Sequence, residues 1–131
     1  MYKMLKRKNS TLKNDVYALA HDLLQIPSTS LNEQRMAEAV QNRLTKLNYD
    51  QACRDEAGNV LGVIEGRKSA ATLLINAHMD TVEADEEAWE GSPLKPRAKN
   101  GRLIGLGASD CKSGLAAMIY AGELLRRCML P

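Results

Sequence analysis

The feature that most constrains this sequence is a short apolar run that ends in two metal-competent side chains. Residues 73–77 read LLINA, and residues 78–80, which follow directly, read HMD. Because the run has no polar face, it predicts a strand over residues 72–77 that is buried on both sides, as inside an α/β sheet. Ligands of such sheets bind at the carboxyl ends of the strands. The sequence therefore places the functional site at His78 and Asp80.

His78 and Asp80 are two residues apart, so on an extended chain their side chains point to the same face. A carboxylate in that position can hold the imidazole in one tautomer, which is the usual arrangement behind a histidine that binds a metal. A lone histidine at the end of a sheet is more often structural. The His-x-Asp pattern together with the loop that contains Asp110 makes the metal role the stronger interpretation for His78.

A glycine-containing loop reaches Asp110 just before a predicted helix. Gly105 and Gly107 allow the backbone to turn tightly, and Asp110 then lies where free N–H groups and the helix dipole favour a carboxylate. An ionised aspartate held there suits a bridging metal ligand. Cys111 adjoins it and has a metal-competent thiol, but we expect that thiol to face away from Asp110 and to form a wall of the site, where it is open to oxidation.

Three stretches in this order resemble the motifs of the zinc-dependent amidohydrolase and exopeptidase family. They are residues 78–82 (HMDTV), Trp89 with Pro93, and residues 101–112. The family includes acetylornithine deacetylase, succinyl-diaminopimelate desuccinylase, aminoacylase and carboxypeptidase G. The resemblance covers most of the chain and is highly specific.

The resemblance implies a role for each matching residue. His78 would bind one zinc ion, and Asp110 would bridge two, with cobalt or manganese as possible replacements for zinc. Asp80 would be the catalytic residue that orients His78. The resemblance also implies a cis peptide bond between Asp110 and Cys111.

The chain departs from the family pattern at three loop positions. Glu83 and Leu94 stand where the family usually has Pro and Phe, and Leu106 stands where it often has Arg. None of these changes removes a metal ligand. They lie where the mouth of the site would be, so they bear on substrate preference.

The family also carries a Glu-Glu pair beyond the helix that follows the bridging aspartate, as general base and zinc ligand. Further on it carries another acidic ligand, a histidine ligand and a small lid or dimerisation domain. Residues 1–131 contain none of these, and the pair Glu86–Glu87 precedes the Asp110 loop and does not match. We therefore interpret residues 1–131 as the N-terminal part of one metallohydrolase catalytic domain, without the lid or dimerisation domain.

The resemblance implies an α/β fold in which a mixed β-sheet is flanked by helices, a three-layer α/β/α arrangement like that of zinc peptidases. The implied function is metal-dependent hydrolysis of amide or peptide bonds, as a deacylase or exopeptidase acting on N-acyl amino acids or small peptides. We expect residues 1–131 alone to be inactive, because they lack the general base. A homodimer is expected only for the full-length form.

Two other functions fit less of the sequence. Gly105 and Gly107 before a helix are typical of a dinucleotide-binding loop, but the third glycine of that pattern would fall at Asp110. A carboxylate there would repel pyrophosphate from the helix N-terminus. The remaining alternative is a catalytically inert scaffold or a truncated gene product.

Composition narrows the class of protein. The chain has 44% hydrophobic and 26% charged residues, a globular balance, and its net charge of +2 favours neither a nucleic-acid partner nor a membrane surface. It has no apolar run near the roughly 20 residues that span a bilayer, and no signal-peptide pattern. Its three cysteines form no close pair, which is typical of reduced thiols. We therefore expect a cytoplasmic protein.

Apolar spacing predicts the elements around the site. A first helix over residues 12–24 ends before Pro27, and the basic residues before it are interpreted as a solvated tail. Ser30 and Glu33 form a capping-box pattern that predicts the start of a second helix. The remaining predictions are a hairpin of strands at 51–56 and 60–65, an ordered loop over 83–99, and a helix after Asp110 that includes residues 116–125.

Overall fold

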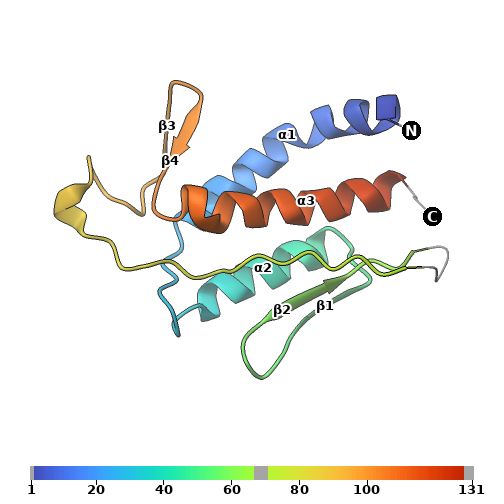
Figure 1. The fold of residues 1–131 in the computed structure, drawn as a ribbon, viewed down its shortest axis with the longest axis horizontal. Helices are drawn as coiled ribbons and strands as arrows, with labels where there is room; N and C mark the ends of the chain where they lie inside the picture. Colours follow the sequence, from blue (N-terminus) through green and yellow to red (C-terminus); the bar gives the residue numbers. More distant parts are fainter. Residues whose placement is uncertain (1, 67–70, 129–131) are drawn as a thin grey trace.

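The structure is a computed structural model that describes residues 2–66 and 71–128, with side chains described from residue 11 onward. In this part of the chain, helices pack against one another and short hairpins lie beside them (Figure 1). The helices are α1 (Tyr2–Leu24), α2 (Gln34–Lys46) and α3 (Ser113–Cys128), with short helical turns at Glu86–Ala88 and Ala108–Lys112. The strands are β1 (Gln51–Arg54), β2 (Val60–Val63), β3 (Arg97–Lys99) and β4 (Arg102–Ile104). Over these same residues, none of the helices has the length and apolar content needed to cross a bilayer.

The core lies between the three α-helices. Each helix contributes an apolar stripe, as the spacing in the sequence predicts, and α1 and α3 run side by side (Figure 1). Ala116 of α3 is fully buried. Burial of these stripes is the main stabilising term of the described fold. The buried residues of the stripes include Leu12, Leu19, Leu23, Met36, Val40, Leu44, Leu115, Ile119 and Tyr120.

The predicted buried strand over residues 72–77 is wrong. The structure assigns no strand to this segment, and the side chains of Leu73 and Leu74 are 75% and 86% exposed. A doubly buried strand needs neighbouring strands and a layer on each face. Among the described residues the strands form only two separate antiparallel pairs, and neither pair includes residues 72–77. The mixed α/β class is confirmed, and the strands that would flank this segment are not among the described residues.

Both pairs are hairpins. The predicted hairpin is confirmed with shorter strands, in which Gln51 of β1 pairs with Val63 of β2. The pair β3–β4 lies partly in the segment expected to be a loop. Its turn residues Asn100 and Gly101 have φ angles of 52° and 74°, and positive φ at both central residues is what an Asn-Gly hairpin turn requires.

The predicted capping box before α2 is also wrong. Helix α2 begins at Gln34, and the residue that caps it, Glu33, makes no side-chain capping bond to it. The Glu33 carboxylate accepts a hydrogen bond from the Leu31 N–H instead, and the Ser30 hydroxyl donates to Asp80. Helix α1 differs from the prediction as well, because its backbone is already helical from Tyr2, through the basic segment interpreted as a tail.

Tyr49 connects α3 to the end of α2. Its hydroxyl donates to the backbone carbonyl of Ile119 at 2.7 Å, and burial raises its pKa to about 12. The ring can reach this carbonyl because Gly122 has no side chain. A Cβ at Gly122 would lie 2.1 Å from the Tyr49 hydroxyl oxygen.

We predict that Gly122→Ala destabilises the fold by roughly 1–3 kcal/mol, the usual cost of overpacking. Gly114→Ala in the same helix is the matched control, because its new Cβ would lie 3.9 Å from the Cys111 Cβ atom, an ordinary van der Waals distance. That control should be neutral or gain up to about 1 kcal/mol from helix propensity. Urea denaturation of both variants gives the comparison. Equal stabilities would show that Tyr49 moves aside without cost.

Candidate metal centre

Two segments carry the candidate residues and meet at a glycine. Gly107, which precedes the turn Ala108–Lys112, has a φ of 79°, and its carbonyl accepts the Lys112 N–H at 2.9 Å. A Cβ at Gly107 would lie 2.8 Å from the Thr81 methyl carbon. Gly107 is therefore required both by its backbone conformation and by the close approach of the segment that contains His78.

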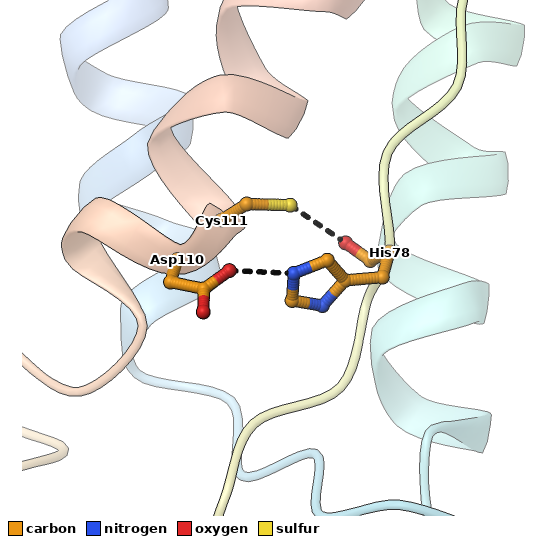
Figure 2. Close-up of side chains that lie close together, drawn as sticks. All are labelled: His78, Asp110 and Cys111. Carbon is orange, nitrogen blue, oxygen red and sulfur yellow. Dashed lines mark hydrogen bonds and ion pairs between the residues drawn. The ribbon is translucent and has the colours of Figure 1, made fainter.

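The side chains of His78, Asp80 and Asp110 converge, as the sequence predicts. Figure 2 shows the His78 ring directed at Asp110, with Nε2 2.7 Å from the Asp110 Oδ1 atom. On the other side of the ring, Nδ1 lies 3.0 Å from the Asp80 Oδ1 atom. The peptide bond between Asp110 and Cys111 is cis, as the family resemblance implies.

The two carboxylates change the proton affinity of the ring. The hydrogen bond with Asp110 is the largest influence and raises the pKa of His78; partial desolvation opposes it, and the bonds to Asp80 add to it. The pKa of Asp80 is lowered chiefly by the hydrogen bond from Ser30, with a further contribution from His78. Without a metal, the His78 ring thus lies between two carboxylate groups whose hydrogen bonds favour its protonated form.

The donor atoms fit a divalent metal of the zinc type. Imidazole nitrogen and carboxylate oxygen are both common zinc ligands, and Asp80 supplies the carboxylate that usually supports a metal-bound histidine. The His78 and Asp110 side chains are 47% and 86% exposed, so the site is open. The group of potential metal ligands found among the described residues contains no Glu side chain.

Cys111 lies on the same side as Asp110, so the predicted opposite orientation is wrong. One ligand atom each from His78, Asp110 and Cys111 lies within 4.8 Å of the others. The alternation expected of an extended chain does not hold, because Asp110 and Cys111 lie in an irregular turn with φ angles of −136° and −132°. The Cys111 thiol donates to the His78 backbone carbonyl at 3.3 Å (Figure 2).

Two residues near the site were not predicted to take part in it. The Ser30 hydroxyl donates to Asp80. The sequence pattern had assigned this hydroxyl to a helix cap, so no role at the site was predicted for Ser30. Lys112 is completely buried, and its ammonium group donates to the Ile26 carbonyl at 2.6 Å. Burial lowers the pKa of Lys112 to about 8. No local pattern in the sequence marks Lys112, because its partner is distant along the chain.

Residues 74–129 match the sequence profile described as Peptidase family M20/M25/M40. This segment contains His78, Asp80 and Asp110, the residues that converge in the structure. Residues 74–129 are therefore similar to proteins of this family. The match confirms the resemblance to zinc-dependent amidohydrolases and exopeptidases that the motifs of the chain indicate.

Curated relatives extend the similarity over nearly all of the chain. A protein of Escherichia coli (strain K12) named "Uncharacterized protein YgeY" is 30% identical over 127 residues, which is 95% of this chain and 31% of that protein. The N-formyl-4-amino-5-aminomethyl-2-methylpyrimidine deformylase of Bacillus subtilis (strain 168) is 33% identical over 132 residues, covering 88% of this chain and 31% of the deformylase. The chain thus spans about a third of the length of these relatives.

We predict that Asp110→Asn lowers the pKa of His78 toward its ordinary value of about 6.5, because it removes the strongest partner of the protonated ring. A raised histidine pKa stabilises the fold fully below the unfolded-state pKa, and this contribution is lost as pH rises through the folded-state pKa. The variant should therefore lose stability at acidic pH and lose less above the His78 pKa.

An NMR titration of the imidazole protons in chelator-treated protein measures this pKa directly. Asp85→Asn is the control, since that carboxylate binds the Glu87 backbone N–H in a different loop. An unchanged His78 titration in Asp110→Asn would contradict the assigned ion pair.

Proposed function

We propose that this chain contributes the first part of the active site of a metal-dependent hydrolase that cleaves amide or peptide bonds. His78 and Asp110 are the proposed metal ligands, and Asp80 orients His78. The observation that carries the proposal is the placement of the His78 ring between the two carboxylates, with Nε2 2.7 Å from Asp110 and Nδ1 3.0 Å from Asp80.

The chemistry of these residues suits a metal site. Asp80 accepts the Nδ1 proton of a neutral His78 ring, which leaves the Nε2 lone pair directed at the position of Asp110. The Asp110 carboxylate has a second oxygen and is open to solvent, so it has the capacity to bridge two cations. A bound zinc, cobalt or manganese ion would supply Lewis-acid polarisation of an amide carbonyl and would acidify water.

Residues 1–131 supply part of the catalytic set in this proposal. A zinc site of a hydrolase has about three protein ligands per metal, and His78 and Asp110 are two. The family resemblance assigns the other ligands and the general-base glutamate to segments that residues 1–131 do not contain. The exposed apolar run at residues 73–75 supports this proposal, because it suits the centre of a larger three-layer α/β/α sheet.

The proposed substrates are N-acyl amino acids or small peptides. The B. subtilis relative is named a deformylase, which supports removal of an acyl group from an amine as the reaction type. Composition supports a cytoplasmic protein without a nucleic-acid or membrane partner, and a homodimer is proposed for the full-length form alone.

The alternative functions have less support. In a dinucleotide-binding loop the position of Asp110 would be open to pyrophosphate, whereas here its carboxylate is paired with His78. An inert scaffold is the second candidate, because the group of potential metal ligands found among the described residues, His78, Asp110 and Cys111, includes no glutamate that could act as the general base. Metal binding separates it from the hydrolase.

We predict that the chain binds Zn²⁺ or Co²⁺ weakly and that His78→Ala reduces this affinity about 10-fold or more. Loss of a residue that only supports a metal ligand already costs about 10-fold or more in affinity, and loss of the ligand itself should cost at least as much. Cys111→Ser should retain the affinity, since the thiol is engaged by the His78 carbonyl. Titration with a competing chromophoric chelator measures both. A thiolate-to-cobalt charge-transfer band in the wild-type chain would show instead that Cys111 is a ligand.

We also predict that residues 1–131 with zinc or cobalt do not hydrolyse N-acetyl or N-succinyl amino acids or dipeptides above the level of a His78→Ala control. General acid/base catalysis alone contributes roughly 100-fold to 10,000-fold in rate, and the group that would provide it is missing. An assay of released amine measures turnover. Turnover that requires both the metal and His78 would overturn the proposed division of the active site.

A further inference from the structure

The two segments that carry the candidate ligands share no strand pairing with each other among the described residues. In addition to their direct contacts with each other, both segments bind residues 26–30 of the connection between α1 and α2, which we name the clasp. Figure 1 shows this connection close to the start of α3. The clasp binds both ligand-bearing segments through hydrogen bonds that span 50 or more residues of sequence.

Ser28 fixes the histidine segment. Its hydroxyl donates to the Met79 carbonyl at 2.8 Å, and its own carbonyl accepts the Thr81 N–H at 2.7 Å. Ser28 and Thr81 are 1% and 6% exposed, so water does not compete with these bonds. A single parallel bridge between Thr29 and Thr81 extends the contact.

The aspartate segment is fixed by Lys112. Its ammonium group reaches the Ile26 carbonyl, and its methylenes pack beside Gly107, where a Cβ would lie 3.2 Å from the Lys112 Cδ atom. Both ends of the clasp therefore act on the site, since Ile26 locates the turn that contains Asp110 and Ser28 locates the backbone next to His78.

Ser30 is the member of the clasp that reaches the site itself. Its hydroxyl donates to the Asp80 Oδ2 atom at 2.6 Å, within the range of strong bonds from a hydroxyl to a carboxylate. The other oxygen of Asp80, Oδ1, faces His78 Nδ1. One carboxylate oxygen is thus bound on each side, which fixes the rotation of the Asp80 carboxylate.

We propose that Ser30 is a positioning residue that orients His78 for metal binding by holding the Asp80 carboxylate. The inference rests on the proposed metal-binding role of His78. No capping role competes for the hydroxyl, because α2 begins at Gln34 without a side-chain cap from Ser30. The Ser30 residue is exposed, so removing its hydroxyl leaves the core intact.

The test compares Ser30→Ala and Ser30→Thr in the full 131-residue chain. Loss of a residue that supports a metal-bound histidine costs about 10-fold to 100-fold in metal affinity, and Ser30 acts one contact further away, so we expect roughly 3-fold to 10-fold weaker Zn²⁺ binding in Ser30→Ala. Ser30→Thr should restore the affinity. Thr45→Ala is the matched control, since that hydroxyl donates to the Gln41 carbonyl within α2, away from Asp80.

A double-mutant comparison shows whether Ser30 acts through Asp80. In an Asp80→Ala background, Ser30→Ala should cause no further loss of Zn²⁺ affinity, because the two changes remove the same support. An additive loss, or a Ser30→Ala affinity equal to that of wild type, would overturn the positioning role. If Ser30→Ala and Ser30→Thr both had lower unfolding temperatures than wild type, the loss of affinity would come from a weaker fold, and the positioning role would be overturned.

The metal-free chain gives a second readout that does not depend on the proposed function. Nitrogen-15 NMR of the His78 ring reports the Nδ1 proton, which should exchange faster with solvent in Ser30→Ala than in wild type or Ser30→Thr. Equal exchange in all three proteins would contradict the inference. Absence of Zn²⁺ binding in the wild-type chain would contradict the proposed function, and the exchange measurement would still decide the orientation of His78 by Ser30.

Discussion

The contact between Thr81 and Gly107 holds the two halves of the candidate site together. A Cβ at Gly107 would lie only 2.8 Å from the Thr81 methyl carbon, so the two segments meet with no room for a side chain. His78 lies three residues before this contact and Asp110 three residues after it. The distance between His78 and Asp110 therefore depends on how closely the backbone at residue 107 approaches Thr81, and only glycine at that position permits this approach.

Information that is local in the sequence predicted the helices and one hairpin correctly. The apolar stripes of α1, α2 and α3 follow from helical spacing, and the β1–β2 hairpin follows from a turn between two short runs. The convergence of His78 and Asp110 was also predicted, from the end of the buried strand expected at residues 72–77, but the structure brings the two residues together without that strand. The predicted strand at residues 72–77 failed for a physical reason, because a strand is defined by its neighbours and the described residues provide none there.

Other errors show where local patterns mislead. The S-x-x-E pattern at Ser30 was a sound basis for a helix cap, but a carboxylate 50 residues away binds the hydroxyl more strongly than a helix N–H would. The β3–β4 hairpin had a usable signal in Asn100–Gly101, which the surrounding prolines and acidic residues obscured. No sequence pattern predicted that the side chains of Asp110 and Cys111 point to the same side. Side chains alternate in extended chains, whereas these two residues lie in an irregular turn.

The exposed apolar segment at Leu73 and Leu74 has a consequence for handling the protein. These side chains are 75% and 86% exposed, and Leu61 and Val63 of β2 are also exposed, at 46% and 37%. Extended apolar chain without a strand partner among the described residues is a template for pairing between molecules. The extent of association between molecules thus depends on protein concentration. Dilute, cold solutions favour the single chain over an intermolecular β-sheet.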